Sequence, residues 1–474
     1  MKPPLGQRLR TLIGREHRAA LYARYLPRRI DRVLLAVIAV AIIAGTVLRA
    51  DVIGSNNRVS SDEVGYAQNA NEILADRPLA TFKWAPGSSL MFAAAAIVRG
   101  YSTIAVRRNS HGVAQYSQLL TELATLVLVA LIAWILAGPW AALVAVALMA
   151  TYEPLIDITR TYLSEPLGGL ALLAMVAAVS WARRRSLHAL LLAGLLAGFA
   201  GLVREDYAVA VAVIMLGLVI DGWPSRRAAF GRAFLYGLVA LAVVTPFVIY
   251  ASLREHRFTP IVSAGPHALF LGTYLPGGGN QFIDVSVTSK AVCRHFRTTH
   301  PKYCHLSPGD AQGLFALVQS EHPGDSDQAA AQAAAFENLN KYMLGHPLKF
   351  AHMLWNKAWN MWSFPWSGGN SIGGGGLKRT TSLFQHQLYS VIAWVGILFG
   401  LALLRRRWAF VVPVLALLAI ALLNTYFAIT PRDNVRFMPF VFLYGAVGLV
   451  VTVRWAAERI RERRAPPPAI ARAP

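Results

Sequence analysis

Ten apolar segments of roughly bilayer-spanning length recur along this chain of 474 residues. Their approximate ranges are 34–48, 116–136, 140–156, 162–181, 187–203, 207–220, 234–250, 388–404, 408–427 and 437–453. Charged residues make up 15% of the chain, whereas a soluble domain carries about 25%. The mean hydropathy is +0.44. The pattern predicts an all-α integral membrane protein, a polytopic bundle of about ten transmembrane helices.

The basic residues cluster between the apolar segments. Nine of the first 32 residues are Lys or Arg, and further clusters lie at 183–185, 226–227, 405–407 and in the tail from Arg454. If the N-terminus is cytoplasmic, ten crossings place every one of these clusters in the cytoplasm, in agreement with the positive-inside rule. The net charge of +22 therefore indicates topology in a cell membrane and contact with anionic lipids, not binding to nucleic acid.

This topology divides the chain into five parts. A basic cytoplasmic segment (1–32) precedes a transmembrane core (33–250), whose first external loop (49–115) includes an apolar run, 90–98, expected along the membrane surface. A large extracytoplasmic loop (251–386), C-terminal transmembrane helices (387–454) and a cytoplasmic tail (455–474) follow. Four tryptophans of the large loop predict an interfacial aromatic anchor: Trp355, Trp359, Trp362 and Trp366.

The two cysteines, Cys293 and Cys304, both lie in the large loop. A disulfide in an oxidising compartment is the favoured interpretation. The neighbouring His295, His300 and His305 leave a zinc site as the alternative.

Charged residues gather at the external ends of the predicted spans. They are Asp62, Glu63 and Lys83 in the first external loop, together with the junctions 157–165, 204–206 and 432–436. Ionisable groups at the membrane are costly and are usually kept for a task. Carboxylates beside guanidiniums suit a substrate with an anionic head and an apolar tail, because Arg matches phosphate oxygens through its planar fork.

Each of these residues also has a purely structural interpretation. Ser60-x-x-Glu63 is a helix capping box, and Asp62 in a first turn complements the helix dipole. Lys83 next to an aromatic residue is typical of a snorkelling side chain. Arg160, Glu165, Arg204 and Arg436 each have neighbouring acids or bases with which to pair.

The pattern Asp62-Glu63-x-x-Tyr66-Ala67 resembles the acidic signature of GT-C-type glycosyltransferases, which include protein O-mannosyltransferases and the lipid A aminoarabinose transferase. Further stretches are similar to that family's motifs in the same order: Lys83-Trp84-Ala85-Pro86-Gly87, where Ala85 replaces one of two paired prolines, then 159–165, 194–204 and Arg436-Phe437-x-Pro439. The loop 251–386 matches least, which leaves the acceptor open.

The resemblance implies transfer of a sugar from a polyprenyl-phosphate-linked donor to an envelope acceptor, which is a protein, lipid or polysaccharide, at the extracytoplasmic face. It assigns Asp62 as the base that deprotonates the acceptor, Glu63 as the group that orients it, and Glu165 as a second acid. Phosphate or substrate binding falls to Lys83, Tyr66, Arg160, Arg204 and Arg436. A single displacement inverts the anomeric centre. Some relatives use a divalent cation and others do not, and this sequence shows no clean ligand set.

Two rival functions remain at this stage. A transporter or flippase for a lipid-linked sugar or another anionic lipid also needs basic residues near a membrane cavity. It should carry charges deep within its spans, whereas most charges here lie at span ends and Glu122 is the exception. A noncatalytic envelope scaffold, in which Asp62 is dispensable, is the other rival.

Overall fold

The computed structural model describes residues 29–55, 59–106, 112–182, 186–222, 225–279, 292–299, 301, 304, 312–366, 376–405 and 407–464. Within these ranges every regular element is helical. Most of the predicted N-terminal basic segment, residues 465–474 of the tail, and the Arg cluster 183–185 lie outside the described residues.

Six helices of the described chain are long and apolar enough to cross a membrane. They are α2 (Arg29–Asp51), α5 (Val113–Ala137), α8 (Glu165–Ala182), α11 (Arg226–Glu255), α17 (Gly376–Leu404) and α20 (Met438–Arg464). A seventh candidate is bent by 62° between α6 (Pro139–Thr151) and the stretch formed by α7 (Glu153–Asp157) and η1 (Ile158–Arg160). The protein is thus an all-α polytopic membrane protein, as predicted.

Three of the ten predicted spans coincide with shorter apolar helices: α9 (Leu187–Val203), α10 (Tyr207–Asp221) and α18 (Trp408–Asn424). A helix of 17 residues, such as α9, is about 25 Å long, slightly less than the hydrocarbon thickness of about 30 Å. Ten crossings therefore remain a prediction, beside six or seven candidate spans.

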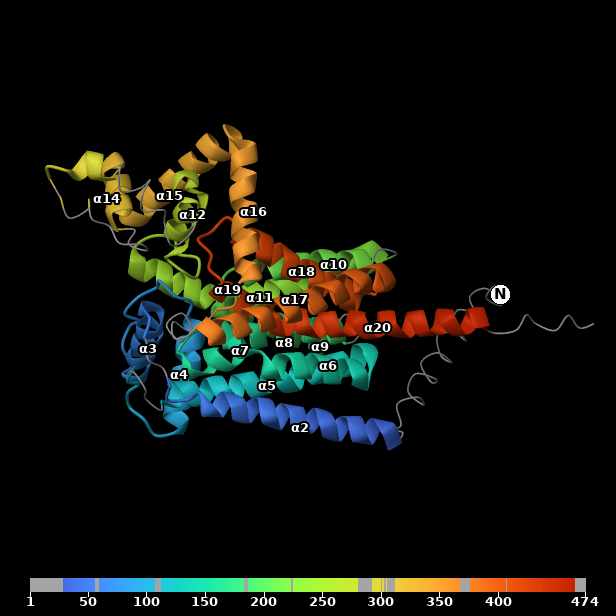
Figure 1. The fold of residues 1–474 in the computed structure, drawn as a ribbon. Helices are drawn as coiled ribbons and strands as arrows, with labels where there is room; N and C mark the ends of the chain where they lie inside the picture. Colours follow the sequence, from blue (N-terminus) through green and yellow to red (C-terminus); the bar gives the residue numbers. More distant parts are fainter. Residues whose placement is uncertain are drawn as a thin grey trace, which may run out of the picture.

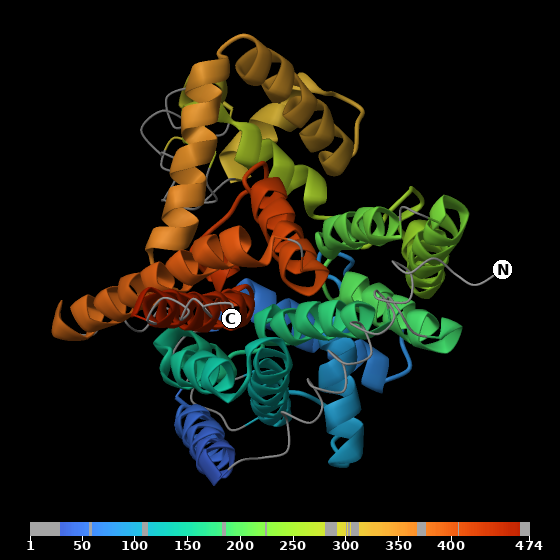
Figure 2. The same cartoon turned by 90° about the vertical axis from the view of Figure 1, so that its right-hand side faces the viewer.

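The long helices lie side by side in a bundle (Figure 1), which Figure 2 shows end-on. Glycines allow α17 and α20 to approach closely, because a Cβ added at Gly448 would collide with the carbonyl oxygen of Gly396. Small residues at helix interfaces are the usual basis of packing in lipid, where apolar side chains gain little by leaving the lipid for each other.

A buried ion pair fixes α2 to its neighbours. The Nε atom of Arg49 lies 3.2 Å from Oε2 of Glu122 in α5, and both side chains are almost fully buried. The same guanidinium donates to the carbonyl oxygens of Gly45, Ala150 and Met149. The one acidic residue that the sequence analysis singled out within a span is therefore paired with a base.

The remaining helices gather at one end of the bundle, called here the site end. They include α3 (Ser61–Leu74) and α4 (Pro86–Val98) from the first loop, then α12 (Gly265–Thr273), α14 (Gln312–Glu321), α15 (Asp327–Asn338) and α16 (Pro347–Ser363) from the large loop (Figure 1). Helices α12, α14 and α15 share a small apolar core around Phe270 and Leu314.

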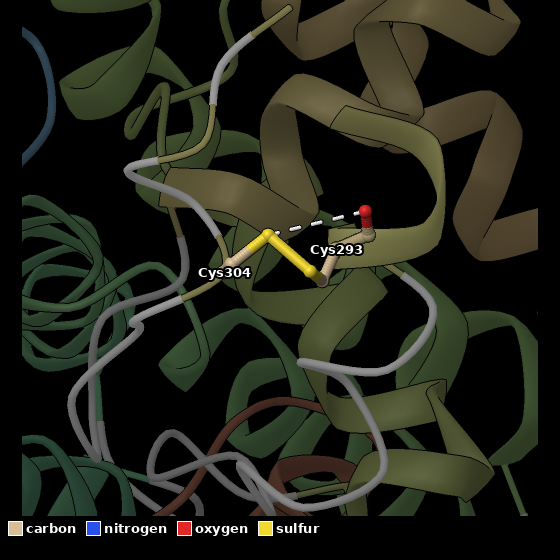
Figure 3. The surroundings of a disulfide bond; sticks show 2 residues. All are labelled: Cys293 and Cys304. Atoms are coloured by element: carbon tan, nitrogen blue, oxygen red, sulfur yellow. Dashed lines mark hydrogen bonds between the residues drawn. A yellow bond between two sulfur atoms is a disulfide. The ribbon is translucent and has the colours of Figure 1, made fainter. Parts of the chain in front are cut away.

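A disulfide joins Cys293 and Cys304, whose Cα atoms are 4.5 Å apart (Figure 3). Because the two sulfur atoms bond to each other, they are not available as zinc ligands, and the alternative of a zinc site loses its two thiolates. Of the three histidines in that alternative, His300 and His305 lie outside the described residues.

Candidate active site

Helix α3 begins with the capping box that the sequence suggested. The Glu63 backbone N–H donates to Oγ of Ser60 over 3.3 Å, and the Ser60 N–H donates to Oε2 of Glu63 over 2.8 Å. The other Glu63 oxygen accepts the Tyr162 N–H over 3.1 Å. Glu63 therefore holds the first turn of α3 against the segment that leads into α8.

The side chain of Asp62 carries one contact on each oxygen. Its Oδ1 accepts from the Trp84 indole N–H over 3.2 Å, and its Oδ2 lies 2.7 Å from Nη2 of Arg432. Gly65 makes room for this arrangement, because a Cβ there would overlap the Trp84 ring. Burial raises the pKa of Asp62, but the Arg432 charge and these hydrogen bonds outweigh it, and the pKa is lowered overall.

Arg432, at the start of α19 (Arg432–Val435), bridges two carboxylates. Besides Asp62, it places Nε 2.9 Å from Oε1 of Glu165, the first residue of α8, which is 1% exposed. Burial lowers the pKa of Arg432, but Glu165, Asp62 and Asp433 together raise it by more, so the guanidinium stays charged. The structure thus brings Asp62 and Glu165, predicted as parts of one site, to one guanidinium.

A second group of ion pairs adjoins this bridge. Nη2 of Arg436 lies 2.7 Å from Oδ2 of Asp206, and Nε of Arg204 lies 3.5 Å from the other oxygen of that carboxylate. Both guanidiniums also approach Oδ1 of Asp433 at 3.9 Å. Arg204 further donates to Oγ of Ser164 over 3.3 Å, and Ser164 precedes Glu165 in the chain. The two groups therefore form one continuous network.

This network is called here the carboxylate–guanidinium cluster. Its members are Asp62, Glu165, Asp206, Asp433, Arg204, Arg432 and Arg436. Four carboxylates face three guanidiniums, so the cluster carries no excess of positive charge when all groups are ionised. Each guanidinium already pairs with at least one carboxylate, so a phosphate that binds here would share or compete for a paired cation.

Lys83 and Tyr66, two predicted substrate-binding residues, border the cluster. Lys83 is exposed, with its Nζ 5.0 Å from the centroid of the Trp84 ring, and its charge contributes to the lowered pKa of Asp62. Tyr66 is buried beside Ser164, and burial raises its pKa. Lys83 thus lies at the accessible side of the cluster and Tyr66 at its buried side.

Arg160, which was predicted to assist phosphate binding, makes a different set of contacts. Its Nη2 lies 2.6 Å from Oδ1 of Asp157, and its Nη1 donates to the carbonyl oxygen of Ser55 over 3.1 Å. Its own carbonyl accepts from the Gln115 side chain over 2.6 Å. These contacts tie the turn before α8 to the end of α2 and to the start of α5.

The sequence did not single out Trp84, Arg432, Asp206 or Asp433 as individual site residues. All four lie in motifs or at span junctions that the sequence had placed at the external ends. What the sequence lacked was a signal that links Arg432 to Asp62. Among the described residues, no group of three or more His, Cys, Asp or Glu side chains is arranged to hold a metal ion.

Comparison with solved structures shows which fold holds this cluster. The oligosaccharyltransferase AglB from Archaeoglobus fulgidus, tethered with an acceptor peptide, aligns with a TM-score of 0.51 at 14% identity, over 93% of this chain and 51% of that one. The same enzyme in complex with an inhibitory peptide and a dolichol-phosphate gives 0.50 at 12% identity, over 92% and 52%. The chain has a GT-C-like fold.

The chain spans about half the length of the AglB structures. ArnT from Cupriavidus metallidurans bound to undecaprenyl phosphate aligns over 92% of this chain and 82% of its own at 15% identity, with a TM-score of 0.40. No protein-family model and no curated protein matches the sequence. At these identities the likeness shows a GT-C-like fold and does not specify the reaction.

Proposed function

We propose that this protein is a glycosyltransferase that transfers a sugar from a polyprenyl-phosphate-linked donor to an acceptor hydroxyl or amine, with inversion of the anomeric centre. One observation carries the proposal. Asp62 and Glu165, from separate segments of the chain, share one guanidinium at the end of an apolar bundle with a GT-C-like fold. This arrangement offers a proton acceptor and phosphate ligands in one place, which is the chemistry that displacement of a lipid phosphate needs.

Asp62 is the proposed base. Its side chain is 23% exposed, and each of its oxygens has a further lone pair to accept a proton, because an ionised carboxylate offers about four acceptor positions. A carboxylate with a lowered pKa is ionised but weakly basic. If the donor phosphate takes Arg432 away from Asp62, the phosphate gains a cation and the pKa of Asp62 rises. Donor binding would then activate the base.

The three guanidiniums of the cluster are the proposed ligands of the phosphate. The anomeric carbon bears a phosphate leaving group, whose developing charge requires cations and not a general acid. Arg204 and Arg436 lie with Arg432 in one network. The bidentate geometry of Arg suits phosphate better than that of Lys, which leaves Lys83 as an accessible accessory cation.

We place the site at the extracytoplasmic face, with ten crossings as the full topology. The support comes from charge: Arg226 begins α11 and the Arg-rich end of α20 runs through Arg464, and both helix ends lie away from the site end (Figure 1). Basic residues prefer the cytoplasmic side of a membrane. The donor class finds support in the dolichol-phosphate bound to AglB, which has the same fold.

The rival proposal of a transporter expected charges deep within the spans, and Glu122 was the one such charge that the sequence singled out. Glu122 is paired with Arg49 and buried between helices. A charge compensated in this way fixes helix packing and does not require a transport pathway to explain it.

Sugar transfer in membranes tests the proposal. Wild type and Asp62→Asn are incubated with a panel of radiolabelled polyprenyl-phosphate sugars and with envelope acceptors, and the anomer formed is determined by NMR. We expect transfer with inversion by wild type and at least a hundredfold slower transfer by the variant, the usual range for loss of a catalytic base being about 10²–10⁴. Glu72→Gln, on the same helix but paired with Arg77, is the matched control. Equal activity of Asp62→Asn, or retention of configuration, would refute the assignment.

A further inference from the structure

Helix α16 has two apolar faces on opposite sides. One face packs into the protein through Phe350, Met353 and Met361. The opposite face exposes Leu348 at 85%, Trp355 at 65% and Trp359 at 60%, and the two tryptophan rings stack with centroids 6.4 Å apart. Their spacings of seven and four residues keep them on one stripe of the helix. Such a stripe on a surface usually marks an interaction site.

The direction of the exposed stripe follows from a contact between α16 and α17. Trp362 lies on the same side of α16, and its ring packs perpendicular to Trp394 of α17 at 5.2 Å. The stripe is therefore on the side where α17 runs. In Figure 1, α16 crosses the direction of the long helices near the site end, and in Figure 2 it extends beyond the bundle. Two of the four tryptophans predicted as an anchor, Trp362 and Trp366, pack against the core instead.

Helix α17, which contacts α16 through Trp394, also has an exposed apolar face. Phe384 and Val391 of α17 are 66% and 60% exposed. These residues belong to a helix long and apolar enough to span the membrane. A helix that lies across a spanning helix near its end, and that exposes an apolar stripe, fits the boundary between acyl chains and head groups.

The charge of α16 fits the same boundary. A polar strip next to the exposed stripe carries Lys349, His352, Asn356 and Asn360, which line a cavity of about 760 Å³ together with Leu275 and Gly278. The helix contains no Asp or Glu. A lysine next to exposed tryptophans, on a helix without acidic residues, is the pattern expected for contact with anionic head groups.

We propose that α16 is an interfacial helix whose Trp355 and Trp359 enter the leaflet at the site end, while Lys349 and His352 contact anionic lipid head groups. Two hydrogen bonds connect the C-terminal end of α16 to α19, which belongs to the carboxylate–guanidinium cluster. The Asn434 side chain of α19 donates to the carbonyl oxygens of Met361 and Phe364 over 2.6 and 3.1 Å. Since α19 carries Arg432, the lipid surface that positions α16 also positions the partner of Asp62.

Depth measurements in a bilayer test this proposal without any assay of transfer. The two native cysteines form the disulfide, so a single added cysteine can be labelled selectively. Trp355→Cys and Trp359→Cys carry a nitroxide, and His352→Cys and Asn356→Cys are the matched controls on the polar strip. The full chain is reconstituted in nanodiscs of phosphatidylcholine and phosphatidylglycerol. We expect the nitroxides at positions 355 and 359 to collide mainly with oxygen, which concentrates in the lipid. Those at positions 352 and 356 should collide mainly with a nickel complex that is dissolved in the water.

Two results would overturn the proposal. Equal exposure of all four labels to nickel would mean that the stripe faces water. Protection of the tryptophan positions from both oxygen and nickel would mean that a protein, such as a second copy, covers it. A second measurement avoids labels: brominated phosphatidylcholine should quench wild-type tryptophan fluorescence more strongly than that of Trp355→Phe/Trp359→Phe.

The head-group contact is tested by the lipid composition. In discs without phosphatidylglycerol, the nitroxide at position 359 should lie less deep. Lys349→Gln should make its depth independent of phosphatidylglycerol.

Discussion

Arg432 and Asp62 form an ion pair of 2.7 Å that joins the short helix α19 to the first turn of α3. The pair holds the proposed base in its ionised form and occupies a cation that a phosphate would need. It therefore restrains the first turn of α3, and under the proposed function it is the contact that donor binding would rearrange. The acidity of Asp62 should then depend on Arg432.

Arg432→Gln should move the acid limb of the pH–rate profile to higher pH. Without the guanidinium, burial remains as the dominant influence and raises the pKa of Asp62. An arginine beside an aspartate typically lowers its pKa by about 1–3 units, and the limb should move by a similar amount. The measurement is kcat/KM for sugar transfer between pH 4 and 8. An unmoved limb with a reduced rate would show that Arg432 binds phosphate without controlling the base.

Acid should weaken folding through the same pair. A carboxylate whose pKa is lower in the folded state than in the unfolded state contributes stability above the unfolded pKa. That contribution disappears as the pH falls through the lowered folded pKa of Asp62. In detergent, the Tm of wild type should fall toward that of Asp62→Asn as the pH decreases below about 4. A difference between the two Tm values that does not change with pH would contradict the ion pair.

The sequence predicts that most residues of the cluster lie at one end of the bundle, but it does not predict which of them form ion pairs. Asp62, Glu165, Arg204 and Arg436 were expected at one end because apolar segments and basic loops order the spans, and the structure brings them together. The capping contact of Glu63 was also visible, since Ser60 and Glu63 are three residues apart. The partnership of Arg432 with Asp62 joins α19 to α3, and no local pattern encodes a contact between segments so distant in the chain.

The bundle interface makes a prediction about stability. Gly448→Ala places a methyl group against the backbone of Gly396 in α17, and such overpacking typically costs about 1–3 kcal/mol. Gly231→Ala in α11 is the control, because no heavy atom lies within 4 Å of its added Cβ. Replacing a helical glycine there should stabilise the fold by roughly 0.5–1 kcal/mol. Thermal unfolding in detergent should therefore move in opposite directions for the two variants.

Substitution of Glu63 should lower stability more than activity, in contrast to substitution of Asp62. Glu63→Ala removes the acceptor of two backbone N–H groups, of Ser60 and Tyr162, and loss of a helix cap costs about 0.5–2 kcal/mol. We expect a lower Tm, with transfer by the folded fraction reduced far less than in Asp62→Asn. Glu63→Gln keeps one acceptor oxygen and should recover part of the stability. A variant that is fully stable but inactive would instead give Glu63 a direct role in the reaction.

Lys357 in α16 should make the folding stability of the protein depend on pH above neutrality. Its side chain is 1% exposed and donates from Nζ to the carbonyl oxygen of Gly272 over 2.8 Å. Burial lowers its pKa to about 7. Between this value and the unfolded pKa of about 10.4, the unfolded chain binds a proton that the folded chain does not. Stability should therefore rise with pH across this window.

Lys357→Met isolates this effect, because methionine fills similar space without a titrating group. The Tm of wild type should rise relative to that of the variant as the pH increases from 6 to 9. The test is how the difference between the two Tm values changes with pH. Loss of the hydrogen bond to Gly272 shifts the Tm of the variant at every pH, so it does not affect this change. A parallel course of the two curves would mean that Lys357 stays charged when folded, and its contact with α12 would then be an ordinary charged hydrogen bond.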